Sequence, residues 1–287
     1  MPIVVLPALV PDIPRLYEIY FASFKADMMG RVLLDILFPG GKTDTAEFRE
    51  AHAKATLDWW SKCDYQYTVK VVDTDTGDIL AMGLGDGYYR ARSAEERRFD
   101  GCTWLEGKQR ERADAILKPL AEMREKLWGA QPYIYVHVIA VDPKHQGRGA
   151  AKAFIDWAQT MGEQMQMPVY FESSPSTVKL YERFGFVRLK EKLAHKGTVL
   201  GLPVVSMDVP LMVKMPSVAH GLTFEEWRDA GYPKFGSEAA KRIKSGGAAA
   251  EGEKGAATTT TTVASEASSE VPKAAARRKS WWKKLVK

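Results

Sequence analysis

The chain has 287 residues, of which 45% are hydrophobic and 27% charged, and this globular composition excludes a collagen, a wholly disordered chain and a coiled-coil rod. No apolar stretch approaches the ~18–20 residues of a bilayer span, and the first residues lack the basic region and cleavage site of a signal peptide, so we expect no secretory leader. The two cysteines, Cys63 and Cys102, exclude a disulfide framework and a four-cysteine zinc site, and they favour a reducing, cytoplasmic location.

The net charge of +5 belongs to the end of the chain. Seven of the 41 Lys and Arg residues lie within 273–287, which holds no acid, so 34 basic residues face 36 acidic ones in the remainder. A nearly neutral body argues against a nucleic-acid-binding domain, and we expect no nucleic-acid partner for the folded part.

Composition divides the chain into three parts. Residues 1–244 form the folded body. Residues 245–272, rich in Gly, Ala, Thr and Ser, cannot bury enough apolar surface to offset the entropy of ordering and are predicted to be a flexible linker. Residues 273–287 form a basic tail that contains tryptophan.

The hydrophobic pattern of the body predicts a mixed α/β domain. In chain order we expect a strand over 3–6, helices over 11–24, 30–37 and 45–61, strands over 65–72 and 79–85, a helix over 106–128, a strand over 133–141, a helix over 147–166, a strand over 169–172, a helix over 176–184, and strands over 186–193 and 203–214. The turn over 73–78 is typical of a hairpin, and the apolar, β-rich run over 133–141 is typical of a central strand.

Residues 141–151, Val-Asp-Pro-Lys-His-Gln-Gly-Arg-Gly-Ala-Ala, connect that central strand to a helix. The first N–H groups of a helix lack intrahelical partners, and the helix dipole places partial positive charge there. Gly147 and Gly149 allow a ligand to approach the backbone, and Arg148 and Lys152 add charge at the rim. The segment therefore predicts a phosphate cradle built mostly from main-chain N–H groups.

This loop has two other interpretations. It is a plain strand-to-helix turn if the glycines serve only the backbone. A dinucleotide-binding loop needs a third glycine where Lys152 stands, and a Walker loop is excluded because Gly-Lys-Ser/Thr is absent.

Three ordered motifs resemble the GNAT acetyltransferase superfamily. Residues 146–151, Gln-Gly-Arg-Gly-Ala-Ala, resemble its Gln/Arg-x-x-Gly-x-Gly/Ala loop, and residues 138–143 resemble the strand before it. Residues 180–186, Leu-Tyr-Glu-Arg-Phe-Gly-Phe, resemble its Leu-Tyr-x-x-x-Gly-Phe signature. The resemblance is carried by residues 131–190 and implies a central mixed, largely antiparallel twisted sheet flanked by helices, here with helical insertions.

The resemblance implies acetyl-CoA as the acetyl donor, with no metal. It places the pyrophosphate on the amides of Gly147, Arg148, Gly149, Ala150 and Ala151, with Gln146 opening the loop. It places the pantetheine arm along the strand edge near Ile139 and Val141. Ser174 stands where many members carry an Asn that touches the cofactor, and its hydroxyl has less reach.

The implied reaction is attack of an amine on the thioester, which requires a base, oxyanion donors and an acid for the leaving thiolate. The resemblance gives the acid role to Tyr181, and main-chain N–H groups near Ile139 or Ala140 are the expected oxyanion donors. Strand alternation predicts that Tyr135, His137 and Ile139 share one face. His137 is the candidate base because histidine titrates near neutral pH, and the arylalkylamine branch carries histidine at this strand position. A packing role remains open for both His137 and Tyr181.

In this family the acceptor enters between the early helices and the late strands, here residues 24–40 and the insertion over 88–130. The apolar composition of 24–40 favours a small, partly hydrophobic amine. O-acetylation of a metabolite, acetylation of protein lysines, and a CoA-binding sensor without turnover remain alternatives.

The basic tail over 277–287, Arg-Arg-Lys-Ser-Trp-Trp-Lys-Lys-Leu-Val-Lys, has three interpretations. It is a solvated basic segment, a contact with an anionic membrane surface, or a signal for nuclear import or nucleic-acid contact.

Overall fold

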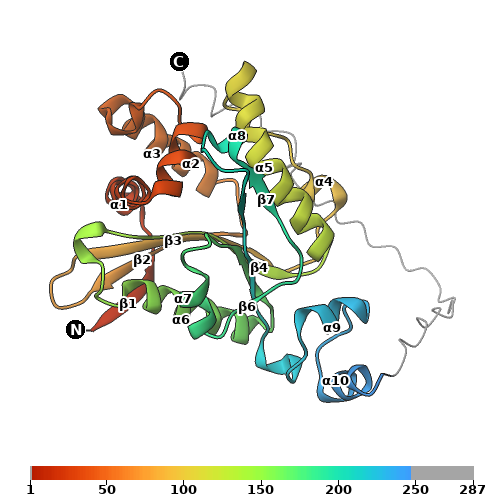
Figure 1. Cartoon of the computed structure of the whole chain (residues 1–287). Helices are drawn as coiled ribbons and strands as arrows, with labels where there is room; N and C mark the ends of the chain where they lie inside the picture. The colour runs from red at the N-terminus through yellow and green to blue at the C-terminus, as the bar shows by residue number, and fades with distance from the viewer. Residues whose placement is uncertain (1, 247–287) are drawn as a thin grey trace, which may run out of the picture.

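A computed structural model describes residues 2–246 and has at its centre a seven-stranded sheet in the order β1-β2-β3-β4-β5-β9-β6 (Figure 1). All neighbouring strands are antiparallel except β4 and β5, which are parallel. Strands β7 and β8 form a separate two-stranded sheet. The strands are β1 Ile3–Pro7, β2 Gln66–Asp73, β3 Ile79–Tyr88, β4 Tyr133–Val141, β5 Val169–Glu172, β6 Val187–Arg188, β7 Ala194–Lys196, β8 Ser206–Asp208 and β9 Leu211–Lys214.

Helices cover both faces of this sheet. In Figure 1, α1, α2 and α3 lie on one side, and α6 and α7 lie on the other. The helices are α1 Ile13–Ala26, α2 Met28–Leu37, α3 Ala46–Trp60, α4 Ala94–Arg97, α5 Gly107–Trp128, α6 Ala150–Met165, α7 Val178–Arg183, α8 Gly197–Leu200, α9 Phe224–Asp229 and α10 Ser237–Lys244. Short 3-10 turns lie at Val10–Asp12, Lys42–Asp44, Pro143–His145 and Ser217–Ala219. The predicted mixed, largely antiparallel sheet with helical insertions is confirmed.

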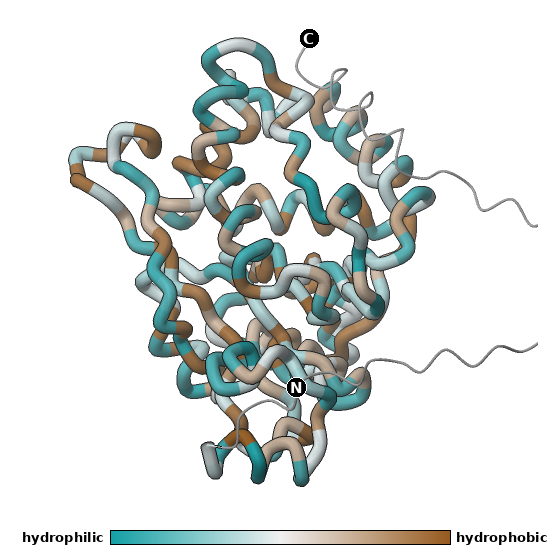
Figure 2. Tube along the Cα trace, turned by 90° about the vertical axis from the view of Figure 1, so that its right-hand side faces the viewer, coloured by the Kyte–Doolittle hydropathy of each residue, from teal (hydrophilic) through white to brown (hydrophobic). Residues whose placement is uncertain are grey.

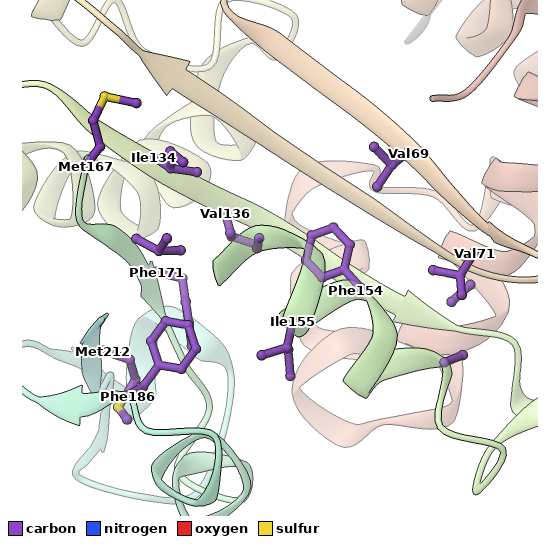
Figure 3. Packing of buried hydrophobic residues seen from close by; sticks show 14 of the residues in the cluster. Val69, Val71, Ile134, Val136, Phe154, Ile155, Met167, Phe171, Phe186 and Met212 are labelled. Atoms are coloured by element: carbon purple, nitrogen blue, oxygen red, sulfur yellow. The ribbon is translucent and has the colours of Figure 1, made fainter. Parts of the chain in front are cut away.

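The main core lies between the sheet and α6. Figure 3 shows Phe154 and Ile155 of α6 among the side chains of the central strands, such as Val136 of β4 and Val71 of β2. Phe154 and Ile155 are each only 2% exposed. Burial of such side chains contributes about 1.5–3 kcal/mol each, so this layer holds α6, and the loop before it, against β4.

We expect Gly83→Ala in β3 to destabilise the protein by about 1–3 kcal/mol, as overpacked cores do. A Cβ at position 83 would lie 1.8 Å from Cε2 of Phe154, a ring that is only 2% exposed and would have to shift within the core. Urea unfolding measures the change. The matched control is Gly236→Ala, where an added Cβ meets nothing within 4 Å and the backbone is extended, and where we expect a change within about 0.5 kcal/mol. Equal effects at the two positions would contradict the packing explanation.

The sheet opens between β4 and β5. These strands pair only at Ile134 with Val169 and at Tyr135 with Tyr170, although β4 continues to Val141. Beyond Tyr135 the edge of β4 that faces β5 therefore carries backbone groups with no strand beside them.

A β-bulge interrupts β4 at His137. Leu84 pairs with Val138 and Gly85 with Val136, so His137 is the extra residue, with no partner on β3. The bulge reverses the alternation of the side chains that follow. Ile139 packs into the core beneath α6, and the prediction that it shares a face with Tyr135 and His137 is wrong.

Two late strands also differ from the prediction. The strand predicted over 186–193 is reduced to β6, two residues long, and the strand predicted over 203–214 divides into β8 and β9. Pro210 stands between these two and has no backbone N–H for a ladder, which ends β8 and lets β9 join the main sheet. The hydrophobic pattern did not distinguish two short strands from one long one.

No helix within residues 2–246 is long and apolar enough to cross a membrane. Along the trace, hydrophilic and hydrophobic residues alternate over short distances (Figure 2). The predicted linker over 245–272 and the basic tail over 273–287 lie, apart from residues 245 and 246, outside the described residues.

Candidate active site

The loop between β4 and α6 has the geometry of an anion cradle. Gly147 and Gly149 adopt φ values of 77° and 86°, a left-handed conformation that favours glycine, and α6 begins at Ala150. Among the described residues, the N–H groups of Gly147, Gly149, Ala150 and Ala151 have no acceptor. These are the orphan donors of a helix start, which suit a phosphate. Gln146 is exposed immediately before them.

The side-chain charges near this loop are held by the protein itself. The Arg148 guanidinium donates to the carboxylate of Asp73, a β2 residue only 1% exposed, and it contacts Nδ1 of His145 at 2.9 Å. Lys152 pairs with Asp156 one helical turn on. The cradle therefore rests on main-chain N–H groups, with Arg148 tying the loop to β2.

Asp142 holds the start of the loop. Its carboxylate accepts the Lys144 N–H at 2.9 Å and an ion pair from Arg15 of α1. Burial alone would raise the pKa of Asp142, but the Lys144 N–H and the Arg15 guanidinium lower it below its usual value.

We expect Asp142→Asn to lower the free energy of unfolding by about 1–2 kcal/mol at neutral pH, because the charge on which Arg15 acts is lost. A carboxyl whose folded pKa is depressed stabilises the protein above its unfolded pKa of about 4, and this contribution disappears as the pH falls through the folded pKa. Urea unfolding between pH 7 and pH 3 should show the two proteins converging in acid. Asp156→Asn, on the helix surface, should change stability by less than about 0.5 kcal/mol, and a pH-independent difference for Asp142→Asn would refute this assignment.

His137 stands at the bulge in contact with a buried carboxylate. Its Nε2 lies 2.8 Å from Oδ2 of Asp86 on β3, and its ring meets the Tyr135 ring edge-on at a centroid distance of 4.2 Å. The Tyr88 hydroxyl donates to the same Asp86 oxygen at 2.7 Å. The Asp86 side chain is 7% exposed and the His137 side chain 32%, so a partly accessible imidazole is oriented by a carboxylate behind it. A histidine oriented in this way is able to act as a general base.

A second polar cluster surrounds Glu172 at the end of β5. Its carboxylate accepts from Tyr135 at 2.7 Å, from Tyr170 at 3.1 Å and from Arg124 of α5 at 3.0 Å. Arg124 also donates to the Tyr135 hydroxyl at 2.9 Å. Burial raises the pKa of Tyr135 well above its usual value. This cluster fixes Tyr135, and through it the ring beside His137.

Tyr181 of α7 is half-buried against Phe171 and Phe186, with ring-centroid distances of 4.5 and 6.3 Å. Burial raises its pKa to about 12. Its hydroxyl has no hydrogen-bond partner among the described residues. Tyr181 therefore keeps its proton at neutral pH and has a donor to offer.

Ser174 lies in the loop between β5 and α7, where its hydroxyl is shared with Ser176 at 2.9 Å and Thr177 at 3.0 Å. The residues predicted for the site lie on β4, on the loop after it and the first turn of α6, or on the segment from β5 through α7. Within residues 2–246 no group of three His, Cys, Asp or Glu side chains is arranged to hold a metal ion.

The site residues predicted from the sequence do not include Asp86, Tyr88, Arg124 or Glu172. A signal existed for the first two, because Asp86 and Tyr88 are polar residues two apart in a strand that otherwise consists of apolar residues and glycines. Arg124 lies on a helix rich in charged residues and gave no signal of its own.

The sequence matches a family model described as an acetyltransferase (GNAT) domain over residues 112–208. The probable acyltransferase SID5 of Ajellomyces capsulatus is 30% identical over 144 residues, which cover 50% of this chain and 99% of that relative. An uncharacterized N-acetyltransferase of Schizosaccharomyces pombe is 32% identical over 54 residues, or 19% of this chain and 23% of that protein.

Two solved structures share the fold at a TM-score of 0.53 and 14% identity. They are the C-terminal condensation domain of Ebony in complex with beta-alanyl-dopamine and arylalkylamine N-acetyltransferase 2 from Aedes aegypti. In each case the match covers 75% of this chain and 99% of the other.

Proposed function

The chain belongs to the GNAT acetyltransferase superfamily, and from this premise we propose that it transfers the acetyl group of acetyl-CoA to the amine of a small acceptor within a ternary complex. The observation that carries the proposal is the open edge of β4 beyond Tyr135, with His137 on one side and Tyr181 on the segment that follows β5. An extended thioester arm fits such an edge, because its amides can pair with the unpartnered strand.

The loop residues would hold the donor. The N–H groups of residues 147–151 face the pyrophosphate, and Gln146 and Ser174 flank it. The arm would run beside Ile139 and Val141 and place the thioester near the bulge. Ile139 and Ala140 are in register with Gly83 and Met82 of β3 on one side and have no strand on the other. Because the N–H groups of successive strand residues point to opposite edges, one of these two residues offers its N–H at the open edge as a donor to the oxyanion.

Proton transfer would use two side chains. His137 takes the proton of the attacking amine at Nδ1, directly or through a water, because Nε2 is held by Asp86, which orients the ring and stabilises its positive charge. Tyr181 donates its hydroxyl proton to the departing sulfur, and its pKa of about 12 keeps that proton available. The C–N bond forms as the C–S bond breaks, so acetylated amine and free CoA leave in equal amounts.

The acceptor would be a small, partly hydrophobic amine. Apolar side chains of α2 pack with α5 and α8 in one cluster, and aromatic residues of α1 and α3 form another on the same side of the sheet. The acceptor class is inferred from these apolar and aromatic residues. The fold shared with arylalkylamine N-acetyltransferase 2 is consistent with it.

Thiol release from acetyl-CoA, measured with a panel of aryl and alkyl amines, tests the proposal. We expect release that depends on the amine. Release with alcohols alone would favour O-acetylation, release with lysine peptides would favour a protein acetyltransferase, and CoA binding without release would favour a sensor.

Contact of the 277–287 tail with anionic membranes remains a prediction, tested by comparing full-length and tail-deleted protein on phosphatidylserine vesicles.

A further inference from the structure

A small polar cavity of about 140 Å³ lies at Tyr88, whose hydroxyl donates to Asp86 of the candidate active site. Its walls come from the end of β3, residues 92–99, α5 and the start of β4. Four arginines and two glutamates line it, namely Arg92, Arg97, Arg98, Arg124, Glu96 and Glu125.

Among the described residues, Arg92 is the cation of this cavity that forms no ion pair, although its charge, after the hydrogen bond from Arg97, also lowers the pKa of Glu125. Within residues 2–246, every other charged lining side chain has an opposite partner, while Arg92 has no ion pair and its side chain donates no hydrogen bond. The Arg92 guanidinium lies over the Tyr88 ring, with 3.4 Å between its central carbon and the ring centroid. Its Nε is buried without an acceptor.

The neighbouring cavity shows that this imbalance is particular to the site. That cavity, about 550 Å³, is lined by four cations that are each paired with a carboxylate. The pairs are Arg97 with Glu125, Arg98 with Asp100, Arg110 with Asp114 and Lys118 with Glu122.

A buried N–H without an acceptor is destabilising, and more so on a charged group. Stacking on Tyr88 occupies the face of the guanidinium and leaves its edge, which carries the donors, for an anion. We propose that this cavity binds a small oxyanion, a carboxylate or a phosphate group, on Arg92. The Tyr88 hydroxyl that donates to Asp86 places the bound anion one side chain away from the Asp86–His137 pair.

Inorganic phosphate is the probe, titrated into full-length protein saturated with CoA so that the loop over 147–151 is already occupied. We expect saturable binding by calorimetry. The Nε–H resonance of Arg92 in arginine-labelled protein should shift with the same dissociation constant, which tests the site without any substitution.

Arg92→Gln should weaken phosphate binding about tenfold or more, since a hydrogen bond to a charged group contributes about 1.5–3 kcal/mol, and Arg92→Lys should restore part of the affinity. Lys118→Gln, which removes a cation from the neighbouring cavity, should leave the affinity unchanged. Absence of saturable binding at millimolar phosphate, or equal affinity in wild type and Arg92→Gln, would overturn the proposal.

A further experiment, which rests on the proposed amine acetylation, shows whether the anion belongs to the acceptor or to a separate effector. Tyr133, at the cavity, and His137 are separated by roughly 13 Å along β4. If the anion belongs to the acceptor, ω-amino carboxylates of suitable length are acetylated with higher kcat/KM than alkylamines of equal length, and Arg92→Gln removes this advantage. If it belongs to a separate effector, phosphate binds and the carboxylates gain nothing. Both results support the site, and phosphate binding reports on it even if no amine is acetylated.

Discussion

Tyr181→Phe is expected to lower kcat by about 10²-fold or more and to leave the affinity for acetyl-CoA nearly unchanged, because a general acid acts only as the thiolate departs. Phenylalanine keeps the packing of the ring against Phe171 and Phe186 and removes only the hydroxyl. Steady-state kinetics and CoA calorimetry on the same preparations separate turnover from binding.

The pH dependence adds a second test of Tyr181. Since burial raises its pKa to about 12, the acid form persists in the folded protein through pH 10, and we expect no alkaline loss of kcat from this group below that pH. The raised pKa of Tyr181 also makes the stability of the protein depend on pH. A neutral form favoured by folding stabilises the protein below the unfolded pKa of about 10, and this contribution is lost as the pH rises toward 12.

The control for Tyr181 is Tyr232→Phe. Its hydroxyl donates to the Leu127 carbonyl far from β4's open edge, so its loss should cost about 1 kcal/mol of stability and leave kcat unchanged. A Tyr181→Phe enzyme with wild-type kcat would show that the residue only packs.

His137→Gln is expected to lower kcat/KM for the acceptor by about 10²- to 10⁴-fold, the usual contribution of a positioned base. The loss should be greatest for strongly basic amines, which arrive as ammonium ions, and smaller for amines that are neutral at the assay pH. Asp86→Asn should give a smaller loss in the same pattern, because it removes the group that orients His137 and stabilises its charge.

His220→Asn provides the comparison for His137. This exposed histidine adopts a φ of 50°, which asparagine also tolerates, and it lies outside the candidate site, so activity should be unchanged. If His137→Gln loses activity equally with strongly and weakly basic amines, His137 does not act as the base for the amine.

Local patterns were sufficient for the elements whose signals lie within one segment. The boundaries of β4 and β5 were predicted to the residue, because each is a short apolar run ended by a break. The turn between β4 and α6 could also be predicted, since glycines at 147 and 149 after Pro143 specify a strand end, a turn and a helix start without help from distant residues. Short strands such as β6, and the division of β8 from β9, depend on which neighbour they pair with, and periodicity did not show it.

By itself, the amino-acid sequence determined the class of fold and the strand, glycine turn and helix over residues 141–151, because these depend on local spacing and motifs; the phosphate site and the two candidates for proton transfer stay predictions. Tertiary structure alone decided what surrounds them. Asp86 contacts His137, which lies 51 residues away in the sequence, and Arg124 contacts Glu172, 48 residues away. Asp73 pairs with Arg148, 75 residues away. The bulge that turns Ile139 away from His137 arises from the register between β3 and β4. Such contacts depend on how strands and helices pack, and no local sequence pattern shows which distant residues come together.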